Sequence, residues 1–346
     1  AIAEYNAILS SRNLQLGILL AELDEMVEKH GDERRTNIDP MPLSMDREDL
    51  VEERAIVISL SEDNYIRHLP VEAFRVQNRG GKGLKGVTTK DEDFPKSILT
   101  CFSKDRLLIF TDQGRVYGLK AWETPQGSRH SRGSHNRNLI ERLREDERVV
   151  TLLPISKEGQ ENPEGQYLIF ATREGIVKRS ELADYTRINR NGKYALKFKT
   201  ETDTLVAVRE ATDEDHVVLV SKFGRACRFK PRETRENADG SCGVTVKVQG
   251  RVTGGVRGMS LKSGDEVVGM IATSNEKTHV LTLSKFGMAK RSILGDGEMH
   301  KVIDENGEEV WDDRTGKPKV ERDGYRKTNR GSGGVATMKL DEKHGE

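Results

Sequence analysis

Five stretches of the chain share one pattern of apolar and polar positions. Each has four or five strand-forming residues, a polar pair or triplet, a turn residue and a second short strand that ends in a cation. The pattern predicts a β-hairpin, because glycine tolerates the positive φ of a tight turn and asparagine is the next most tolerant residue. The copies are residues 56–70, 107–120, 168–180, 217–230 and 280–292, with turn positions Asn64, Gly114, Gly175, Gly224 and Gly287.

A second strand-rich element follows most of these hairpins. Residues 194–208 and 255–271, and less clearly 148–154, are interpreted as strand, acidic turn and strand. Two hairpins per repeat make a four-stranded blade, so the five visible repeats predict an all-β fold, a propeller-like ring of small sheets.

The first residues have a different pattern. Apolar side chains recur at approximately helical spacing, with Gly31 as a C-terminal stop, which predicts an α-helix over residues 1–31. We expect this helix to pack on a domain outside the given chain, since sustained heptads for a free coiled coil are absent. Residues 32–54 hold two prolines and many charges and are expected to be a linker, and residues 55–346 to be the ring. Because the chain starts at Ala1 inside the helical pattern, we expect a fragment of a longer protein.

Composition limits the class of protein. The 346 residues are 34% hydrophobic and 33% charged with a net charge of zero, and no apolar run is long enough to span a bilayer. Cys101, Cys227 and Cys242 lack the spacing of a disulfide framework or a zinc site. Neither a phosphate-binding P-loop nor a nucleophile turn is present, so no catalytic or metal-binding residue is predicted.

The zero net charge hides a segregation of charge. Residues 1–54 hold 13 acids and 6 bases, a net charge of −7, and residues 295–324 hold 10 acids and 5 bases, a net charge of −5. The remainder therefore carries +12, and a partner that meets it meets a basic surface.

Glycine-rich basic loops follow several hairpins. Residues 74–86 (FRVQNRGGKGLKG) have echoes in residues 185–192 and 325–331 and a basic variant in residues 128–137. Glycine lets a backbone approach closely, and arginine and lysine neutralise phosphate oxygens, so one such loop per blade predicts a curved track that bends a duplex without reading its sequence. A single loop of this kind is more often a solvated turn, but the recurrence favours binding. Aromatic residues are only 5% of the chain and do not interleave with the loops, which disfavours stacking on single strands.

The cations at the hairpin ends could join this track, or could only protect strand ends from aggregation. The predicted DNA contacts are Arg67, Arg75, Gln77, Asn78, Arg79, Gly80, Gly81, Lys82, Gly83, Lys85, Arg129, Arg132, Lys178, Arg179, Arg187, Arg190, Lys193, Arg225, Arg228, Lys290, Arg291, Arg326, Lys327 and Arg330.

These features carry a resemblance to a known family. The run from Gln77 to Gly83 resembles the signature box of the C-terminal DNA-wrapping domain of bacterial DNA gyrase A, with Asn78 where an arginine is usual. Residues 21–36 are similar to the segment in which the helical arm of the breakage-reunion domain ends. The resemblance implies a six-bladed β-pinwheel whose outer edge winds duplex DNA with positive handedness and so gives direction to ATP-dependent negative supercoiling.

The resemblance also implies partners and a location. The fragment would be a non-catalytic part of a type II topoisomerase, since none of its tyrosines has the context of the family's cleavage tyrosine. The rest of gyrase A, together with gyrase B, would complete a heterotetramer that uses ATP and Mg²⁺ elsewhere. We expect a cytoplasmic, nucleoid-associated bacterial protein with no membrane contact and no cofactor in this fragment.

Three departures from the family pattern leave alternatives open. Only five hairpins are visible where six blades are usual. Residues 295–324 are interpreted as an insertion, either a phosphate mimic or, by preference, a solvated extra hairpin, and residues 241–255 as a shorter insertion without assigned function. The alternatives to gyrase are the equivalent domain of topoisomerase IV and, from another class, a propeller scaffold that binds acidic proteins.

Overall fold

The computed structural model describes residues 1–32, 36, 48, 50–74, 93–128, 131–140, 142–236, 242–303, 309–312 and 315–340. The chain forms two compact units, Ala1–Leu50 and Val51–Glu346. Among the described residues no helix has the length and apolar character needed to cross a membrane.

The first unit is helical, in agreement with the apolar spacing. Helix α1 spans Ile2–Ser10 and α2 spans Arg12–His30, with an extended residue, Ser11, between them. Gly31 ends α2 at a φ of −69°, so the stop does not use a left-handed residue. Neither helix buries a side chain within this chain, and the leucines of α2 are exposed.

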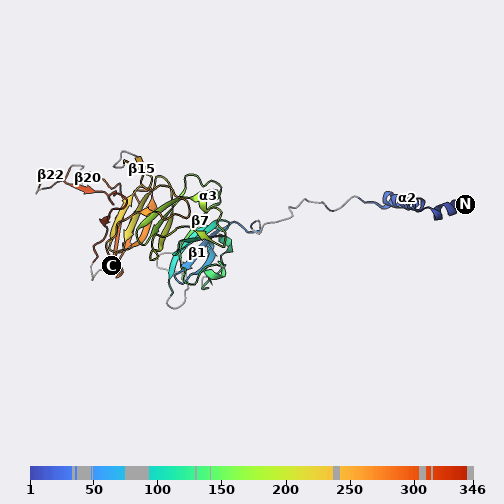
Figure 1. The fold of residues 1–346 in the computed structure, drawn as a ribbon, viewed down its shortest axis with the longest axis horizontal. Helices are drawn as coiled ribbons and strands as arrows, with labels where there is room; N and C mark the ends of the chain where they lie inside the picture. The colour runs from blue at the N-terminus through green and yellow to red at the C-terminus, as the bar shows by residue number, and fades with distance from the viewer. Residues whose placement is uncertain are drawn as a thin grey trace. The chain divides into compact units, whose positions relative to one another are not determined.

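The second unit is a ring of four antiparallel sheets of four strands each (Figure 1). The four predicted hairpins at its centre are β1 (Ala55–Ser61) with β2 (Tyr65–Pro70), β4 (Arg106–Thr111) with β5 (Arg115–Lys120), β8 (Tyr167–Thr172) with β9 (Ile176–Glu181), and β12 (His216–Ser221) with β13 (Arg225–Phe229). On one edge they carry β3 (Pro95–Phe102), β7 (Val149–Ile155), β11 (Leu205–Ala211) and β17 (Val267–Thr273). On the other edge lie two-residue strands, β6 (Ser134–His135), β10 (Lys193–Tyr194), β16 (Val256–Arg257) and β24 (Val335–Ala336).

The short edge strands come from the following repeat. β6 follows the second hairpin in sequence but pairs with β2 of the first, and β10, β16 and β24 likewise pair with the preceding hairpin. We call these four the exchanged strands. The prediction that each second element is a hairpin was therefore wrong: its first strand completes the preceding sheet, and only its second strand joins the sheet of its own repeat.

The turns are formed as predicted. φ is positive at Asn64, Gly114, Gly175, Gly224 and Gly287. In four repeats the carbonyl oxygen of this residue also accepts a backbone N–H from the segment after the exchanged strand, for example from Ala195 to Gly114 at 2.8 Å and from Thr337 to Gly224 at 2.8 Å. The turn residue thus closes its own hairpin and fixes the incoming strand.

The core lies between the sheets. Along β4, Leu107 and Ile109 pack with residues of the first sheet, whereas Leu108 and Phe110 pack with Leu168 and Phe170 of the third. Successive side chains of a strand point to opposite faces, so a strand buried on both faces must be apolar at every position. This explains the continuous apolar runs in the hairpins.

The fifth hairpin, β18 (His279–Leu283) with β19 (Ala289–Ile293), is a two-stranded sheet. Within the described part of the chain no further sheet covers its outer face, and Leu281 and Leu283 are 62% and 67% exposed. Val280 and Leu294 pack on the other side against the fourth sheet.

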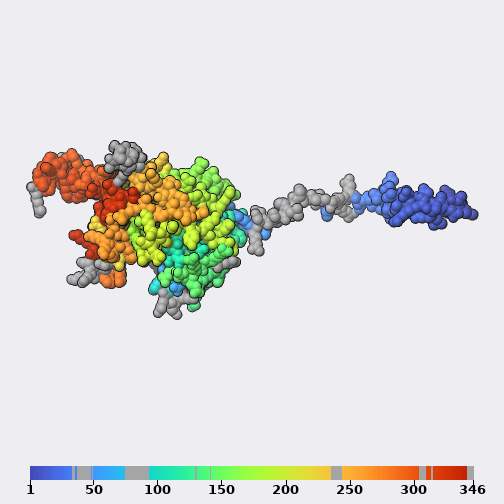
Figure 2. Space-filling view, in the orientation of Figure 1, coloured from blue at the N-terminus to red at the C-terminus, as the bar shows by residue number. Residues whose placement is uncertain are grey.

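Two ribbons extend from the ring. Strands β14 (Thr234–Glu236) and β15 (Cys242–Val244) pair in the fourth repeat. In the acidic insertion, β20 (Met299–Lys301) pairs with β23 (Val320–Arg322) and β21 (Trp311–Asp312) with β22 (Lys317–Pro318). This insertion projects from the body of the ring (Figure 2). The remaining elements are α3 (Lys157–Glu161) and the 3₁₀ turns Val71–Ala73, Ala121–Glu123, Asn136–Asn138 and Leu182–Tyr185.

Candidate nucleic-acid interface

The basic loops lie against the sheet that precedes their own. We call residues 124–133, 186–192, 246–255 and 325–334 the second to fifth loops. Backbone N–H groups of the second, fourth and fifth loops donate to the second strand of the preceding hairpin: Gly127 to His68 at 3.0 Å, Gln249 to Arg179 at 2.8 Å, and Thr328 to Arg228 at 2.7 Å. The loops therefore occupy equivalent positions in successive repeats.

Each loop ends at a position that requires glycine. Gly133, Gly192, Gly255 and Gly334 immediately precede the exchanged strands and have φ between +68° and +84°. A Cβ at Gly255 or Gly334 would lie 2.5 Å from a carbonyl oxygen of the preceding sheet. The glycine lets the loop backbone lie directly on that sheet.

The loops are on the outer edge of the ring. Neighbouring sheets contact one another through β3, β7, β11 and β17, which form the inner edge of each sheet. The exchanged strands, and the loops that lead into them, lie on the opposite edge.

The exchanged strands and the segments that follow them are hydrogen-bonded to the next loop. In the third repeat the segment after the exchanged strand reaches the fourth loop, where the Lys197 N–H donates to the Thr253 carbonyl oxygen at 3.3 Å. The fourth repeat reaches the fifth loop in the same way: Ser260 donates to Ser332 at 2.9 Å, and the Arg330 side chain donates to the Arg257 carbonyl oxygen at 2.6 Å. Repeats three to five thus form one continuous line of backbone.

Ten of the predicted DNA contacts reach the surface of this edge or of the fifth hairpin. Arg225 and Arg330 are half-buried, and the Arg225 guanidinium donates to the Gly333 and Gly334 carbonyl oxygens. Arg190 forms an ion pair at 2.5 Å with Glu123 of the second repeat. The exposed members are Arg132, Arg187, Arg190, Lys193, Lys290, Arg291, Arg326 and Lys327.

Four predicted contacts are instead buried, and for these the structure corrects the sequence analysis. Arg67, Lys178, Arg179 and Arg228 are at most 3% exposed. Arg67 donates to the Ser128 and Ser131 carbonyl oxygens of the second loop, and Lys178 donates to the Ala195 and Arg251 carbonyl oxygens. They hold the loops on the sheets and present no charge to a duplex.

The other two buried cations also have internal partners. Arg179 pairs with Asp213 and lies 3.7 Å from the centre of the Tyr167 ring. Arg228 donates to the Leu294, Gly295 and Tyr325 carbonyl oxygens at 2.8 to 3.0 Å. Burial lowers the pKa of Arg67, Arg228 and Lys178, that of Lys178 to about 7. Long aliphatic stems allow these side chains to be buried while the charged end bonds carbonyl oxygens.

The remaining predicted contacts lie outside the described residues. They are Arg75, Gln77, Asn78, Arg79, Gly80, Gly81, Lys82, Gly83, Lys85 and Arg129.

A family comparison matches the ring segment by segment. A family model described as the DNA gyrase C-terminal domain, beta-propeller, matches residues 55–99, 105–156, 166–211, 243–274 and 319–346, more than half of the chain. The chain belongs to this DNA gyrase C-terminal domain family.

Curated relatives agree with this assignment. The DNA gyrase A subunit of Staphylococcus epidermidis (strain ATCC 12228 / FDA PCI 1200) is 38% identical over 347 residues, which cover 99% of this chain and 34% of the relative. The same protein of Staphylococcus aureus (strain COL) is 36% identical over the same shares. The chain thus spans about a third of the length of these relatives.

Two solved structures share the fold. The C-terminal domain of DNA topoisomerase IV aligns with a TM-score of 0.53 at 21% identity, covering 85% of this chain and 92% of that one. The DNA gyrase A C-terminal domain aligns with a TM-score of 0.53 at 22% identity, covering 84% and 97%. These likenesses, together with the family model, confirm the predicted propeller-like architecture.

The structure adds cations to the edge of this gyrase-family ring that the sequence analysis missed. Gly255 takes the same position as Gly334, so residues 246–255 are the fourth loop, and the true insertion is the β14–β15 ribbon. The fourth loop could have been identified from the sequence, because the Gly254-Gly255 pair matches Gly333-Gly334 of the fifth loop. The added residues are Lys197, Lys199, Lys247, Arg251 and Arg257, of which Arg251 alone is half-buried.

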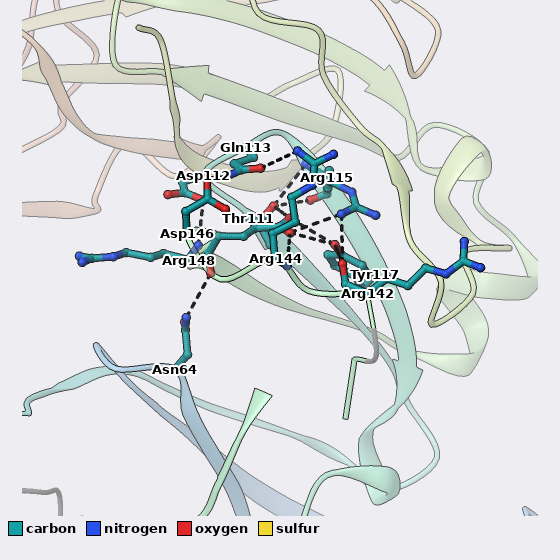
Figure 3. Close-up of polar contacts among 11 residues, drawn as sticks. Asn64, Thr111, Asp112, Gln113, Arg115, Tyr117, Arg142, Arg144, Asp146 and Arg148 are labelled. Atoms are coloured by element: carbon teal, nitrogen blue, oxygen red, sulfur yellow. Dashed lines mark hydrogen bonds and ion pairs between the residues drawn. The ribbon is translucent and has the colours of Figure 1, made fainter. Parts of the chain in front are cut away.

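A buried carboxylate, Glu147, fixes a further basic segment in the second repeat. It accepts hydrogen bonds from Thr111 at 2.5 Å, from Tyr117 at 3.1 Å and from the Arg144 backbone at 3.1 Å. Figure 3 shows this network, with the side chains of Arg142 and Arg148 extending away from it. Burial and the Glu147 charge raise the pKa of Tyr117, so its hydroxyl stays a donor.

Among the described residues one group could approach a metal ion. Asp296, His300 and Asp323 each offer a ligand atom within 4.8 Å of the others. The negative charges of both carboxylates oppose the lowering of the pKa of the buried Arg228, and His300 Nε2 lies 2.6 Å from Asp296 Oδ2. We therefore interpret the group as a partly exposed polar cluster at the base of the insertion.

Proposed function

We propose that this domain binds, bends and wraps duplex DNA without reading its sequence, and so gives direction to ATP-dependent negative supercoiling by DNA gyrase. The observation that carries the proposal is the hydrogen-bonded line of basic loops on the outer edge, from Lys193 through Arg257 to Arg330. Gyrase A relatives along 99% of the chain support it.

The chemistry of the line suits a phosphate backbone. Its exposed groups are arginine and lysine side chains beside glycine-rich backbone, which position a duplex but carry no base readout. A duplex that follows the edge must bend, and its deformation energy would be repaid by contacts to successive loops.

The wider assignment rests on the same proposal. The domain would be a non-catalytic part of gyrase A, with DNA cleavage, ATP and Mg²⁺ located elsewhere in a heterotetramer with gyrase B. It would work in the bacterial cytoplasm in association with the nucleoid. Residues 1–31 would belong to the preceding helical arm and residues 32–54 to a linker.

Two measurements test the proposal. A track that neutralises about six to ten phosphates should lose roughly a thousandfold or more in affinity between about 50 and 200 mM salt. Ligation of relaxed circles in the presence of the domain should shift their linking number in the positive direction. A flat salt response would favour a scaffold for other partners, and an unchanged linking number would exclude chiral wrapping.

The topoisomerase IV domain is the second candidate, because its structure aligns as well as the gyrase one. The intact heterotetramer distinguishes the two assignments. Gyrase should introduce negative supercoils into relaxed plasmid in the presence of ATP, whereas topoisomerase IV should only relax or decatenate.

A further inference from the structure

We propose that the acidic ribbon, residues 295–324, competes with DNA for the fifth loop and lowers the affinity of the domain for a duplex. The inference rests on the proposed function, because it takes the fifth loop as a DNA contact.

The base of the acidic ribbon is fixed beside that loop. Arg228, on the fourth sheet, donates from one nitrogen to the Leu294 and Gly295 carbonyl oxygens, where the ribbon begins, and to the Tyr325 carbonyl oxygen, where the fifth loop begins. Arg228 is 1% exposed, and the negative charges of Glu276, Asp296 and Asp323 oppose the lowering of its pKa by burial. Both ends of the ribbon are therefore held at the start of the loop.

A direct contact joins the acidic ribbon to a cation of the loop. Glu298 pairs with Lys327, with 3.8 Å between Oε1 and Nζ. Gly297 lies against the same loop backbone, since a Cβ there would be 2.7 Å from the Tyr325 carbonyl oxygen and 3.1 Å from the Lys327 nitrogen. A phosphate that approaches Lys327 therefore competes with Glu298 for the charge of this ammonium group.

The Glu298–Lys327 ion pair is weak enough for a DNA phosphate to compete with it. Lys327 and Glu298 are 44% and 66% exposed, and exposed ion pairs are individually weak and screened by salt. The whole ribbon carries a net charge of −5 in sequence, and this negative charge repels an approaching phosphate backbone. The family match stops at residue 274 and resumes at residue 319, so most of the ribbon lies outside the shared pattern.

The test compares duplex binding by the full chain and by charge variants. Glu298→Gln, Glu309→Gln and Glu321→Gln, combined, reduce the negative charge of the ribbon at three exposed positions. Glu52→Gln and Glu53→Gln at the end of the linker and Asp63→Asn in the first hairpin, combined, change the net charge equally at exposed positions. With a short random-sequence duplex at about 50 mM salt, the ribbon variant should bind about three- to tenfold more tightly than wild type and the control less than twofold. The gain should shrink as salt rises.

The same ribbon substitutions, made in a chain that lacks two cations of the fifth loop, show whether the change in affinity arises at that loop. With Arg326→Ala and Lys327→Ala present, the ribbon substitutions should raise duplex affinity by at most half as much as in the wild-type background. The reason is that the cations for which ribbon and DNA compete are absent. Equal gains from ribbon and control variants, or an undiminished gain in this background, would overturn the inference while leaving DNA binding intact. If wild type, ribbon variant and control all fail to bind the duplex, the proposed function itself fails.

Discussion

At the scale of single residues, the same position of the hairpin is filled by chemically different side chains. In the first, third and fourth repeats the third residue after the turn is Arg67, Lys178 and Cys227, each buried and within bonding distance of a carbonyl oxygen in the next repeat's loop. The sequence shows a cation at a strand end but not the loop carbonyl oxygens it will meet, because Ser128 and Arg251 lie 61 and 73 positions away from Arg67 and Lys178. Burial of the four cations therefore could not be predicted.

The glycines before the exchanged strands lead to a stability prediction. Gly334→Ala combines a left-handed φ of +68° with a Cβ only 2.5 Å from the Ala226 carbonyl oxygen, and should lower the free energy of unfolding by about 2 kcal/mol or more. Gly250→Ala, in the fourth loop, meets nothing within 4 Å and should change it by less than about 0.5 kcal/mol. Chemical denaturation checks both, and equal losses would contradict the glycine argument.

Buried Lys178 predicts a pH dependence. Its folded pKa of about 7 lies below the ordinary value of 10.5, so between these limits the unfolded state binds more protons and stability rises with pH. Below pH 7 both states are protonated and the full cost of burial remains. Relative to Lys178→Met, wild type should gain free energy of unfolding from pH 7 to 10, and a difference independent of pH would contradict the lowered pKa.

At the scale of elements, local pattern identified the hairpins but not the strand exchange. Turn chemistry and apolar runs are local properties, and all five turns were placed correctly. The exchanged strands are two residues long and pair with a sheet from the previous repeat, so nothing in their own sequence distinguishes them from a loop. The second elements were assigned as hairpins for this reason.

Two leucines at one position of the hairpin repeat test the packing. Leu108 and Leu281 both lie six residues before the turn glycine, but Leu108 is fully buried between two sheets and Leu281 is 62% exposed. Leu108→Ala should cost about 2 to 5 kcal/mol of unfolding free energy, and Leu281→Ala less than about 0.5 kcal/mol. A large loss at Leu281 would show that another surface covers the fifth hairpin in solution.

At the scale of the whole molecule, the recurrence of basic loops in successive repeats was a better guide to their arrangement than the sequence of any single loop. The sequence placed basic loops at equivalent positions, and those that the structure describes, in the second, third and fifth repeats, each lie against the preceding sheet. The links that join loops three to five are backbone hydrogen bonds, which depend on the fold and leave no trace in residue type. Lys197 and Lys199 were missed because they follow an exchanged strand that was not recognised.

These two lysines predict a loss of DNA affinity. Lys197→Ala with Lys199→Ala should weaken duplex binding severalfold and reduce the slope of log affinity against log salt by about 1 to 2, since each lysine neutralises up to one phosphate. Lys157→Ala with Lys277→Ala removes two exposed lysines outside the loops and should leave the slope within about 0.5 of wild type. Equal slopes for the two variants would place the track elsewhere.

The exchanged strands also determine the order in which the sheets can be completed during synthesis of the chain. The first sheet requires Ser134 and His135, and the fourth requires Val335 and Ala336, residues that leave the ribosome only after the next hairpin has been made. Each of the four sheets therefore keeps one unpaired edge until the exchanged strand of the next repeat has been synthesised. A nascent chain interrupted between two repeats would present that edge to any neighbour able to pair with it.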